Sequence, residues 1–146
     1  MKLPSGLHGR RNVVLDTMVF IYLFEDSSGY GQVCEFLVDK AGSGLFSGIV
    51  TPITAAELVV KPIEKKREDL ADRYILSLQS MKNIKPVFMD FKIGQLAGAL
   101  RAKYKLPLPY MIQAAFALCS EKPTIITNDK AMKIIKEVQI YLLDQF

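Results

Sequence analysis

Histidine and cysteine are scarce in this 146-residue sequence, which has one histidine, His8, and two cysteines, Cys34 and Cys119. Zinc hydrolase sites, Ser-His-Asp triads and Cys-His pairs all need a histidine in the folded core. Because His8 lies ahead of the first predicted strand, its position argues against all three kinds of site. Any catalysis must therefore come from carboxylates and hydroxyls. Both cysteines fall among apolar residues of predicted helices and are expected to be buried free thiols in a reducing cytoplasm.

Long apolar runs are missing as well. No stretch approaches the roughly 20 apolar residues of a membrane span, and the N-terminal residues contain basic side chains but no apolar run of signal-peptide length. We therefore expect a cytoplasmic protein with no membrane partner. Residues 1–11 are predicted to be a flexible leader. Residues 12–146 suffice for one domain, whereas two domains would each be too small for a good core.

Short β-rich runs alternate with helical patterns along the rest of the chain. Strands are predicted at residues 13–15, 45–50, 84–89, 124–127 and 138–143. Helical patterns occupy residues 29–40, 65–81, 90–104, 110–120 and 130–136, and another helix opens at Pro52. Such alternation implies βαβ units and a mostly parallel sheet covered on both faces, which is an α/β fold of the three-layer α/β/α sandwich type. Pro86 predicts either an edge position for the third strand or an irregular strand.

Three carboxylates fall close to the carboxyl ends of these predicted strands. Asp16 directly follows the first strand, Asp129 follows the fourth by one residue, and Glu57 lies near the start of the helix after the second. Ligands of parallel sheets bind at this edge, where the strand order reverses. If strands one and four flank that point, all three side chains point into one crevice. Like charges held close need a cation to offset them, and oxygen ligands without histidine or thiolate favour Mg²⁺ or Mn²⁺.

Each carboxylate also has a purely structural interpretation. Asp16 fits the cap of the following helix, and Asp129 fits an Asx-turn with Asn128. Residues 54–57 fit a capping box in which Glu57 bonds back to the cap. The metal hypothesis therefore rests on the three acids taken together.

Three segments of the sequence resemble the PIN-domain family, and in particular the VapC-like toxins of bacterial and archaeal toxin–antitoxin pairs. They are residues 13–17 (VVLDT), 51–58 (TPITAAEL) and 127–130 (TNDK), and the resemblance runs from about residue 12 to 143. It implies a PIN-like fold, a Mg²⁺- or Mn²⁺-dependent ribonuclease that acts on RNA, a homodimer, and a small antitoxin partner. Carried over by position, the metal-site and catalytic carboxylates are Asp16, Glu57 and Asp129. The supporting polar groups are Thr17, Thr127 and Asn128.

The chain departs from the family at one acidic position. The family places an aspartate at the start of the helix before the fourth strand, where this chain has Tyr110. A neutral phenol with a reference pKa of about 10 is a poor substitute for a carboxylate ligand. The domain therefore works with one metal, has lost catalysis while keeping the fold, or has reduced activity that its host tolerates. Tyr110 also fits two other roles, packing in the core or at the rim of the site and stacking on an RNA base.

The charge balance is mildly basic, with a formal net charge of +4. This permits a polyanionic partner such as RNA but does not require one. Lys61, Lys65, Lys66 and Arg67 are interleaved with acids, which favours a solvated helix face over RNA contact. The candidates for RNA phosphate contact are Arg101, Lys103 and Lys105, which have no intervening acid.

Apolar side chains crowd residues 18–24, where Phe20, Tyr22 and Phe24 alternate with other apolar residues. This is more than one buried helix face requires and is consistent with a dimer interface, although a fully buried helix gives the same pattern.

Two functions from different classes follow from the sequence. The first is a metal-dependent endoribonuclease, the toxin of a toxin–antitoxin pair. The second is a catalytically silent PIN-like domain that binds RNA or protein. A nucleotide- or flavin-binding protein ranks below both, because no glycine-rich phosphate loop follows the first strand.

Overall fold

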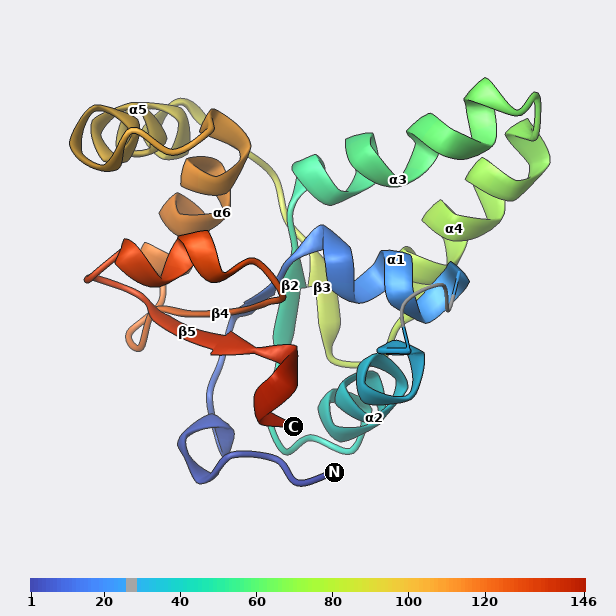
Figure 1. Cartoon of the computed structure of the whole chain (residues 1–146), viewed down its shortest axis with the longest axis horizontal. Coiled ribbons are helices and arrows are strands. Elements are labelled where there is room, and N and C mark those ends of the chain that lie inside the picture. The colour runs from blue at the N-terminus through green and yellow to red at the C-terminus, as the bar shows by residue number, and fades with distance from the viewer. Residues whose placement is uncertain (26–28) are drawn as a thin grey trace.

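A parallel sheet of five strands forms the centre of the computed structural model, which describes residues 1–25 and 29–146 (Figure 1). The strand order is β3-β2-β1-β4-β5, and all four neighbouring pairs are parallel. The strands are β1 (Val13–Leu15), β2 (Gly48–Val50), β3 (Ile84–Pro86), β4 (Thr124–Thr127) and β5 (Gln139–Leu142). The sequence thus located every strand, but overestimated the length of β2, β3 and β5. The edge position predicted from Pro86 is confirmed.

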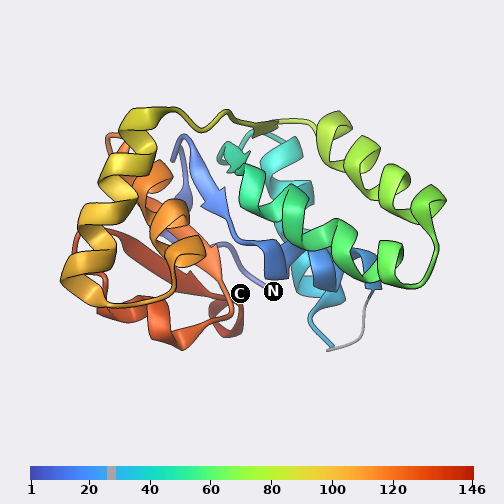
Figure 2. The ribbon, with the colours of Figure 1, turned by 90° about the horizontal axis from the view of Figure 1, so that it is seen from above.

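Helices cover both faces of this sheet, which confirms the three-layer α/β/α sandwich. Figure 2 shows the α3–α4 pair and the α5–α6 pair on opposite sides of the molecule. The helices are α1 (Thr17–Glu25), α2 (Gly31–Gly42), α3 (Pro52–Glu64), α4 (Glu68–Ser80), α5 (Phe91–Tyr104) and α6 (Leu108–Leu118). Short 3-10 helices occupy Ser5–Leu7, Lys130–Ile134 and Leu143–Gln145. Among the described helices, none combines the length and the apolar character that a bilayer span requires.

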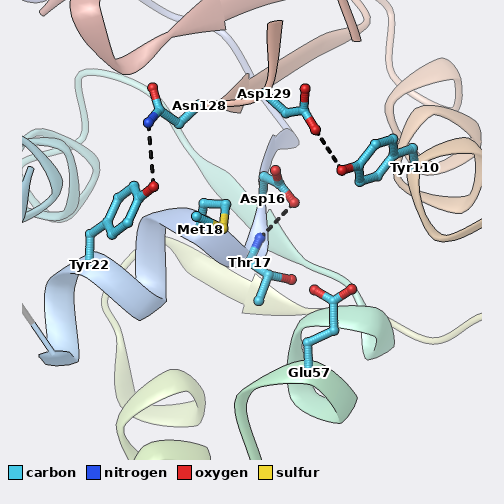
Figure 3. A pocket seen from close by; sticks show the side chains of 8 residues that line it. All are labelled: Asp16, Thr17, Met18, Tyr22, Glu57, Tyr110, Asn128 and Asp129. Carbon is cyan, nitrogen blue, oxygen red and sulfur yellow. Dashed lines mark hydrogen bonds between the residues drawn. The ribbon is translucent and has the colours of Figure 1, made fainter. Parts of the chain in front are cut away.

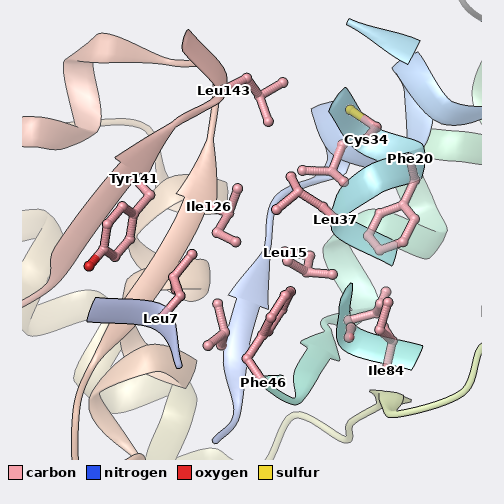
Figure 4. Close-up of a cluster of buried hydrophobic side chains, with 14 of the residues drawn as sticks. Leu7, Leu15, Phe20, Cys34, Leu37, Phe46, Ile84, Ile126, Tyr141 and Leu143 are labelled. Atoms are coloured by element: carbon pink, nitrogen blue, oxygen red, sulfur yellow. The ribbon is translucent and has the colours of Figure 1, made fainter. Parts of the chain in front are cut away.

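Successive side chains of each strand point to opposite faces of the sheet, and this divides the core into two clusters. Val13 and Leu15 of β1 pack on one face with α1, α2 and α4, whereas Val14 packs on the other with α5 and α6. This is the period-two pattern of a strand buried on both faces. The first cluster is the one drawn in Figure 4.

The structure differs from the expected flexible leader at two side chains. Leu3 is only 6% exposed and Leu7 is fully buried in the first core cluster, where Figure 4 shows it near Tyr141. The backbone N–H of Lys2 also donates to the carbonyl of Phe146 at 2.9 Å. Burying two leucines stabilises the folded state by roughly 1.5–3 kcal/mol each, which outweighs the disorder expected from the polar residues around them.

The two cysteines do not share the expected burial. Cys34 lies inside α2 and is fully buried, and this burial raises the pKa of its thiol to about 12. Cys119 caps the C-terminus of α6 and is exposed, so the prediction of burial was wrong for this residue. The helix α6 ends at Leu118, two residues before the end predicted at residue 120.

The order of the strands reverses between β1 and β4. From β1 the chain moves outward through β2 to β3, and then returns to the other side of β1 with β4 and β5. The carboxyl ends of β1 and β4 therefore flank the point at which ligands of parallel sheets bind.

Candidate active site

A cavity of about 340 Å³ lies at the carboxyl ends of β1 and β4 (Figure 3). Side chains of α1, α3 and α6 close it on the other sides. It is lined by Asp16, Thr17, Met18, Tyr22, Glu57, Tyr110, Asn128 and Asp129. The structure thus gathers all three predicted carboxylates around one cavity, together with the tyrosine that occupies the fourth acidic position.

Asp16 is the most firmly held of these carboxylates. It is only 6% exposed, and its oxygens accept three hydrogen bonds: from the Thr127 hydroxyl at 2.6 Å, the Thr17 backbone N–H at 2.8 Å and the Gln113 amide at 3.3 Å. Burial raises the pKa of Asp16, the hydrogen bonds oppose that rise, and the charge of Glu57 adds to it. A carboxylate in this position is fixed in orientation but short of positive charge.

Gln113 is a buried polar residue that was not predicted from the sequence to belong to the site. Its side-chain carbonyl accepts a hydrogen bond from the Thr51 hydroxyl at 2.7 Å, so its amide nitrogen is the end that faces Asp16. A glutamine within residues 111–117, otherwise entirely apolar and buried, is the signal that could have identified it. Each buried polar atom of such a network needs its partner, because an unpaired one costs about 1–3 kcal/mol.

Asp129 both caps a 3-10 helix and lines the cavity. It caps the 3-10 helix Lys130–Ile134, where its Oδ1 accepts the Ala131 backbone N–H at 2.8 Å, as the Asx-turn interpretation predicted. Its Oδ2 accepts the hydroxyl of Tyr110 at 2.5 Å. The Thr127 hydroxyl that holds Asp16 also accepts the backbone N–H of Asp129, at 3.0 Å.

Tyr110 enters the cavity from the first turn of α6. The hydrogen bond to Asp129, partial burial, and the negative charges of Asp129, Asp16 and Glu57 raise the pKa of its hydroxyl to about 12. The phenol is therefore protonated at neutral pH and acts as a hydrogen-bond donor. Its place at the rim agrees with the packing interpretation, and stacking on RNA stays a prediction.

Glu57 is exposed and reaches the cavity from α3. The capping-box interpretation is wrong, because α3 begins at Pro52 with Thr51 as its cap and Thr54 lies inside the helix. The Thr54 hydroxyl instead pairs with that of Thr17 at 2.9 Å. Glu57 is thus not engaged with the helix terminus.

The predicted supporting groups lie around these carboxylates. Thr17 and Thr127 bind Asp16, as described, while the Asn128 amide donates to the Tyr22 hydroxyl at 3.4 Å. Tyr22 and Met18 complete the wall formed by α1; the sequence indicated Tyr22 only for a dimer interface and did not indicate Met18 for the site.

The donor set fits a divalent cation held in an open site. Within residues 1–25 and 29–146, no group of three or more His, Cys, Asp or Glu side chains is arranged to hold a metal ion by itself. Mg²⁺ does not need such a group, since proteins bind it through one or two carboxylates with waters completing the coordination. Asp16 offers a buried carboxylate short of positive charge and Glu57 an exposed one, and both donate oxygen only. These ligands suit Mg²⁺ or Mn²⁺ and not a closed zinc site.

The predicted RNA-binding residues near the end of α5 do not line the cavity. Lys103 forms an ion pair with Glu137, which also accepts the Tyr104 hydroxyl, and these contacts lower the pKa of Glu137 to about 2. Arg101 and Lys105 are exposed. On the other candidate surface, Arg67 pairs with Asp69 at 2.9 Å, as expected for a solvated helix face.

Comparison with known proteins gives one family and one fold. The PIN domain model matches residues 13–138. A search among curated proteins gave no match. The solved structures of similar fold include VapBC2 from Rickettsia felis bound to a DNA fragment from its promoter, with 15% identity over 91% of this chain and 98% of that one and a TM-score of 0.71.

Two further structures share this fold. A toxin–antitoxin complex from Klebsiella pneumoniae has 23% identity over 87% of this chain and 95% of that one, with a TM-score of 0.64. VapBC-1 from nontypeable Haemophilus influenzae has 21% identity over 92% and 98%, with a TM-score of 0.68.

Proposed function

Because the chain belongs to the PIN domain family, we propose that it is a divalent-metal-dependent endoribonuclease and the toxin of a toxin–antitoxin pair. PIN-domain toxins of the VapC type are generally nucleases, and PIN nucleases generally use divalent metals. The observation that carries the proposal is Asp16, a buried carboxylate fixed by three donors at the edge of a cavity that Glu57 and Asp129 also line.

The residues of the cavity have different roles in this proposal. Asp16, Glu57 and Asp129 are the carboxylates that line the cavity and among which the cation would find its ligands. A bound divalent cation supplies an activated water and offsets negative charge on the scissile phosphate. Thr127, Thr17 and Gln113 hold Asp16 in one orientation, so no reorganisation of that group is needed during the reaction.

The direct test is calorimetric titration of the protein with Mn²⁺ and Mg²⁺, combined with an RNA cleavage assay. Cleavage should require the cation, stop on addition of a chelator and return when Mn²⁺ is restored in excess. If the protein binds neither cation and cuts no RNA, the carboxylates are structural and the nuclease proposal fails.

The second candidate function is a silent PIN-like module that binds RNA or protein. The hydrogen bond between Tyr110 and Asp129 favours this silent module, because the bond engages a carboxylate that a catalytic site would use. This alternative predicts RNA binding that is insensitive to divalent cations. The titration above therefore separates the two functions.

We propose a small antitoxin as the protein partner. The similar structures from Rickettsia felis and Haemophilus influenzae are VapBC proteins, and the one from Klebsiella pneumoniae is a toxin–antitoxin complex. Co-expression with the product of a small adjoining gene should give a complex that no longer cuts RNA. Failure of the two chains to co-purify would count against the pairing.

RNA phosphates are expected to contact Arg101 and Lys105 but not Lys103, whose charge is already paired with Glu137. Replacing Arg101 and Lys105 with glutamine should reduce the slope of log affinity against log salt by about 0.7 per lost contact for a single strand. Binding to an uncut RNA measured at several salt concentrations checks this. The matched control is Lys65→Gln with Lys66→Gln, which removes the same charge from the end of α3. Equal slopes in the two double variants would assign no special role to the α5 residues.

Homodimerisation is proposed through a different surface from the one that the sequence indicated. Phe20 is fully buried, and Phe24 stacks on Tyr74 with ring centroids 4.8 Å apart, so these aromatic residues of α1 pack within the chain. Phe88 and Phe91, between β3 and α5, are instead 96% and 98% exposed. Two neighbouring phenylalanines left in water indicate a contact surface.

The Phe88→Ser, Phe91→Ser double variant should therefore sediment as a monomer under conditions in which the parent is a dimer. The fold should be unaffected, because neither side chain contributes to the core. Leu76→Ser, which changes another exposed apolar residue on α4, is the control and should leave the mass unchanged. A double variant that still dimerises would place the interface elsewhere.

A further inference from the structure

Tyr110 does more than leave the site one carboxylate short. Its hydroxyl donates to Oδ2 of Asp129, while Oδ1 of the same carboxylate accepts the backbone N–H of Ala131. Both oxygens of Asp129 are therefore engaged by the chain itself. Figure 3 shows the phenol directed at Asp129, whereas Glu57 approaches from α3 on the opposite side of Asp16.

The two aspartates are held in different ways. The donors to Asp16 come from the strand ends and from Gln113, and they fix a carboxylate that is buried at the base of the cavity. The donor to Asp129 is a side chain that itself lines the cavity and occupies the position where a fourth carboxylate was expected. A cation that approaches Oδ2 of Asp129 from the cavity has to share that oxygen with this phenol or displace it. Hydrogen bonds to a charged acceptor are among the stronger ones, so this competition has a measurable cost.

We propose that Tyr110 is a positioning residue that holds Asp129 out of the metal-ligand set, so that the site takes one divalent cation on Asp16 and Glu57. This inference rests on the proposed metal-dependent function. It differs from the simple loss of a ligand, because it predicts that removal of one oxygen atom from Tyr110 improves metal binding even though no carboxylate is added.

The test is Mn²⁺ titration by calorimetry of the Tyr110→Phe variant. Phenylalanine keeps the ring and the net charge but frees Oδ2 of Asp129, so the variant should bind Mn²⁺ about tenfold more tightly than the parent. Tyr104→Phe is the matched control, because it removes a tyrosine bond to a carboxylate, Glu137, outside the cavity. Its Mn²⁺ affinity should equal that of the parent. Thermal unfolding in chelator verifies that both variants are folded.

A further substitution tests whether the gain in Mn²⁺ affinity comes from the carboxylate oxygens of Asp129. Adding Asp129→Asn to the Tyr110→Phe variant should cancel the gain, because the freed carboxylate is then absent. Unchanged or weaker Mn²⁺ binding by Tyr110→Phe overturns the inference, and it leaves the nuclease proposal standing if Asp16→Asn still abolishes binding. If neither the parent nor Tyr110→Phe binds Mn²⁺, both the inference and the nuclease proposal are overturned.

Discussion

Asp16→Asn is expected to lower metal-dependent RNA cleavage by about three orders of magnitude or more, equivalent to at least about 4 kcal/mol of transition-state stabilisation. Substitution of Asp16 should have the largest effect among the three carboxylates, since Asp16 is buried, oriented by Thr127 and Gln113, and close to the charge of Glu57. Asparagine has the same shape but lacks the charge that attracts a cation. The loss should appear in the catalytic rate and in Mn²⁺ affinity together.

The fold should survive this substitution. The asparagine carbonyl can occupy the place of Oδ1 and accept from Thr17 and Gln113, and its amide can donate to the Thr127 hydroxyl, which also acts as an acceptor. Because burial raises the pKa of Asp16 above its ordinary 3.8, folding favours the protonated form. Its contribution to stability is fully present below about pH 3.8 and is lost as the pH rises through the folded-state pKa. Asparagine cannot ionise, so metal-free stability at pH 7 should be equal or higher.

Two measurements check this prediction. In thermal unfolding with chelator, the stability of the parent should fall more steeply than that of Asp16→Asn as the pH rises from 4 to 7. RNA cleavage at saturating Mn²⁺ should be lost in Asp16→Asn but kept in Asp72→Asn, which neutralises an exposed acid on α4. Cleavage by Asp16→Asn at the parent rate would remove this residue from the mechanism.

Tyr110→Asp is expected to raise RNA cleavage about 10- to 100-fold and to tighten Mn²⁺ binding. The substitution removes the phenol that occupies Asp129 and adds a fourth carboxylate to the cavity at the same time. A fourth negative charge also increases repulsion among Asp16, Glu57 and Asp129, so metal-free stability should fall by about 1–2 kcal/mol. Saturating Mn²⁺ should more than restore it, since a ligand that binds only the folded state stabilises that state.

Comparison with two other substitutions separates these contributions. Tyr110→Asn has nearly the same size as Tyr110→Asp and no charge, so any gain common to both comes from freeing Asp129. Tyr110→Phe keeps the ring, and its difference from Tyr110→Asn reports the loss of packing. Cleavage assays and calorimetry on the three variants give the comparison. If Tyr110→Asp cuts RNA no faster than the parent, the tyrosine is not what limits this site.

The sequence predicted the features that depend on local patterns. Alternating strands and helices predicted the parallel sheet, and the positions of Asp16 and Asp129 just beyond two strands predicted that both would reach one edge of it. Glu57 was placed correctly, although its capping alternative failed because the helix starts at Pro52, one turn earlier than a cap at Thr54 requires.

The contacts that the sequence could not predict join residues distant in the chain. Gln113 and Asp16 are 97 residues apart, and no local pattern indicates that a helical glutamine meets a strand end. The burial of Leu3 and Leu7 was not predicted for a similar reason, since it depends on a cluster that includes Tyr141. The bond between Tyr110 and Asp129 spans only 19 residues, but it depends on how α6 is set against the end of β4.

The pairing of β1 with β4 also determines at what stage of synthesis this site can assemble. Asp16 leaves the ribosome early, but the Thr127 hydroxyl that binds it and the Asp129 carboxylate beside it are made more than a hundred residues later. Until then the central strand has only β2 beside it, and its acidic end has no partner from the second half of the sheet. Contacts this distant in sequence form late in folding. A chain that ends before β4 therefore lacks an assembled cavity, and any activity of this site requires that β4 has been made and has paired with β1.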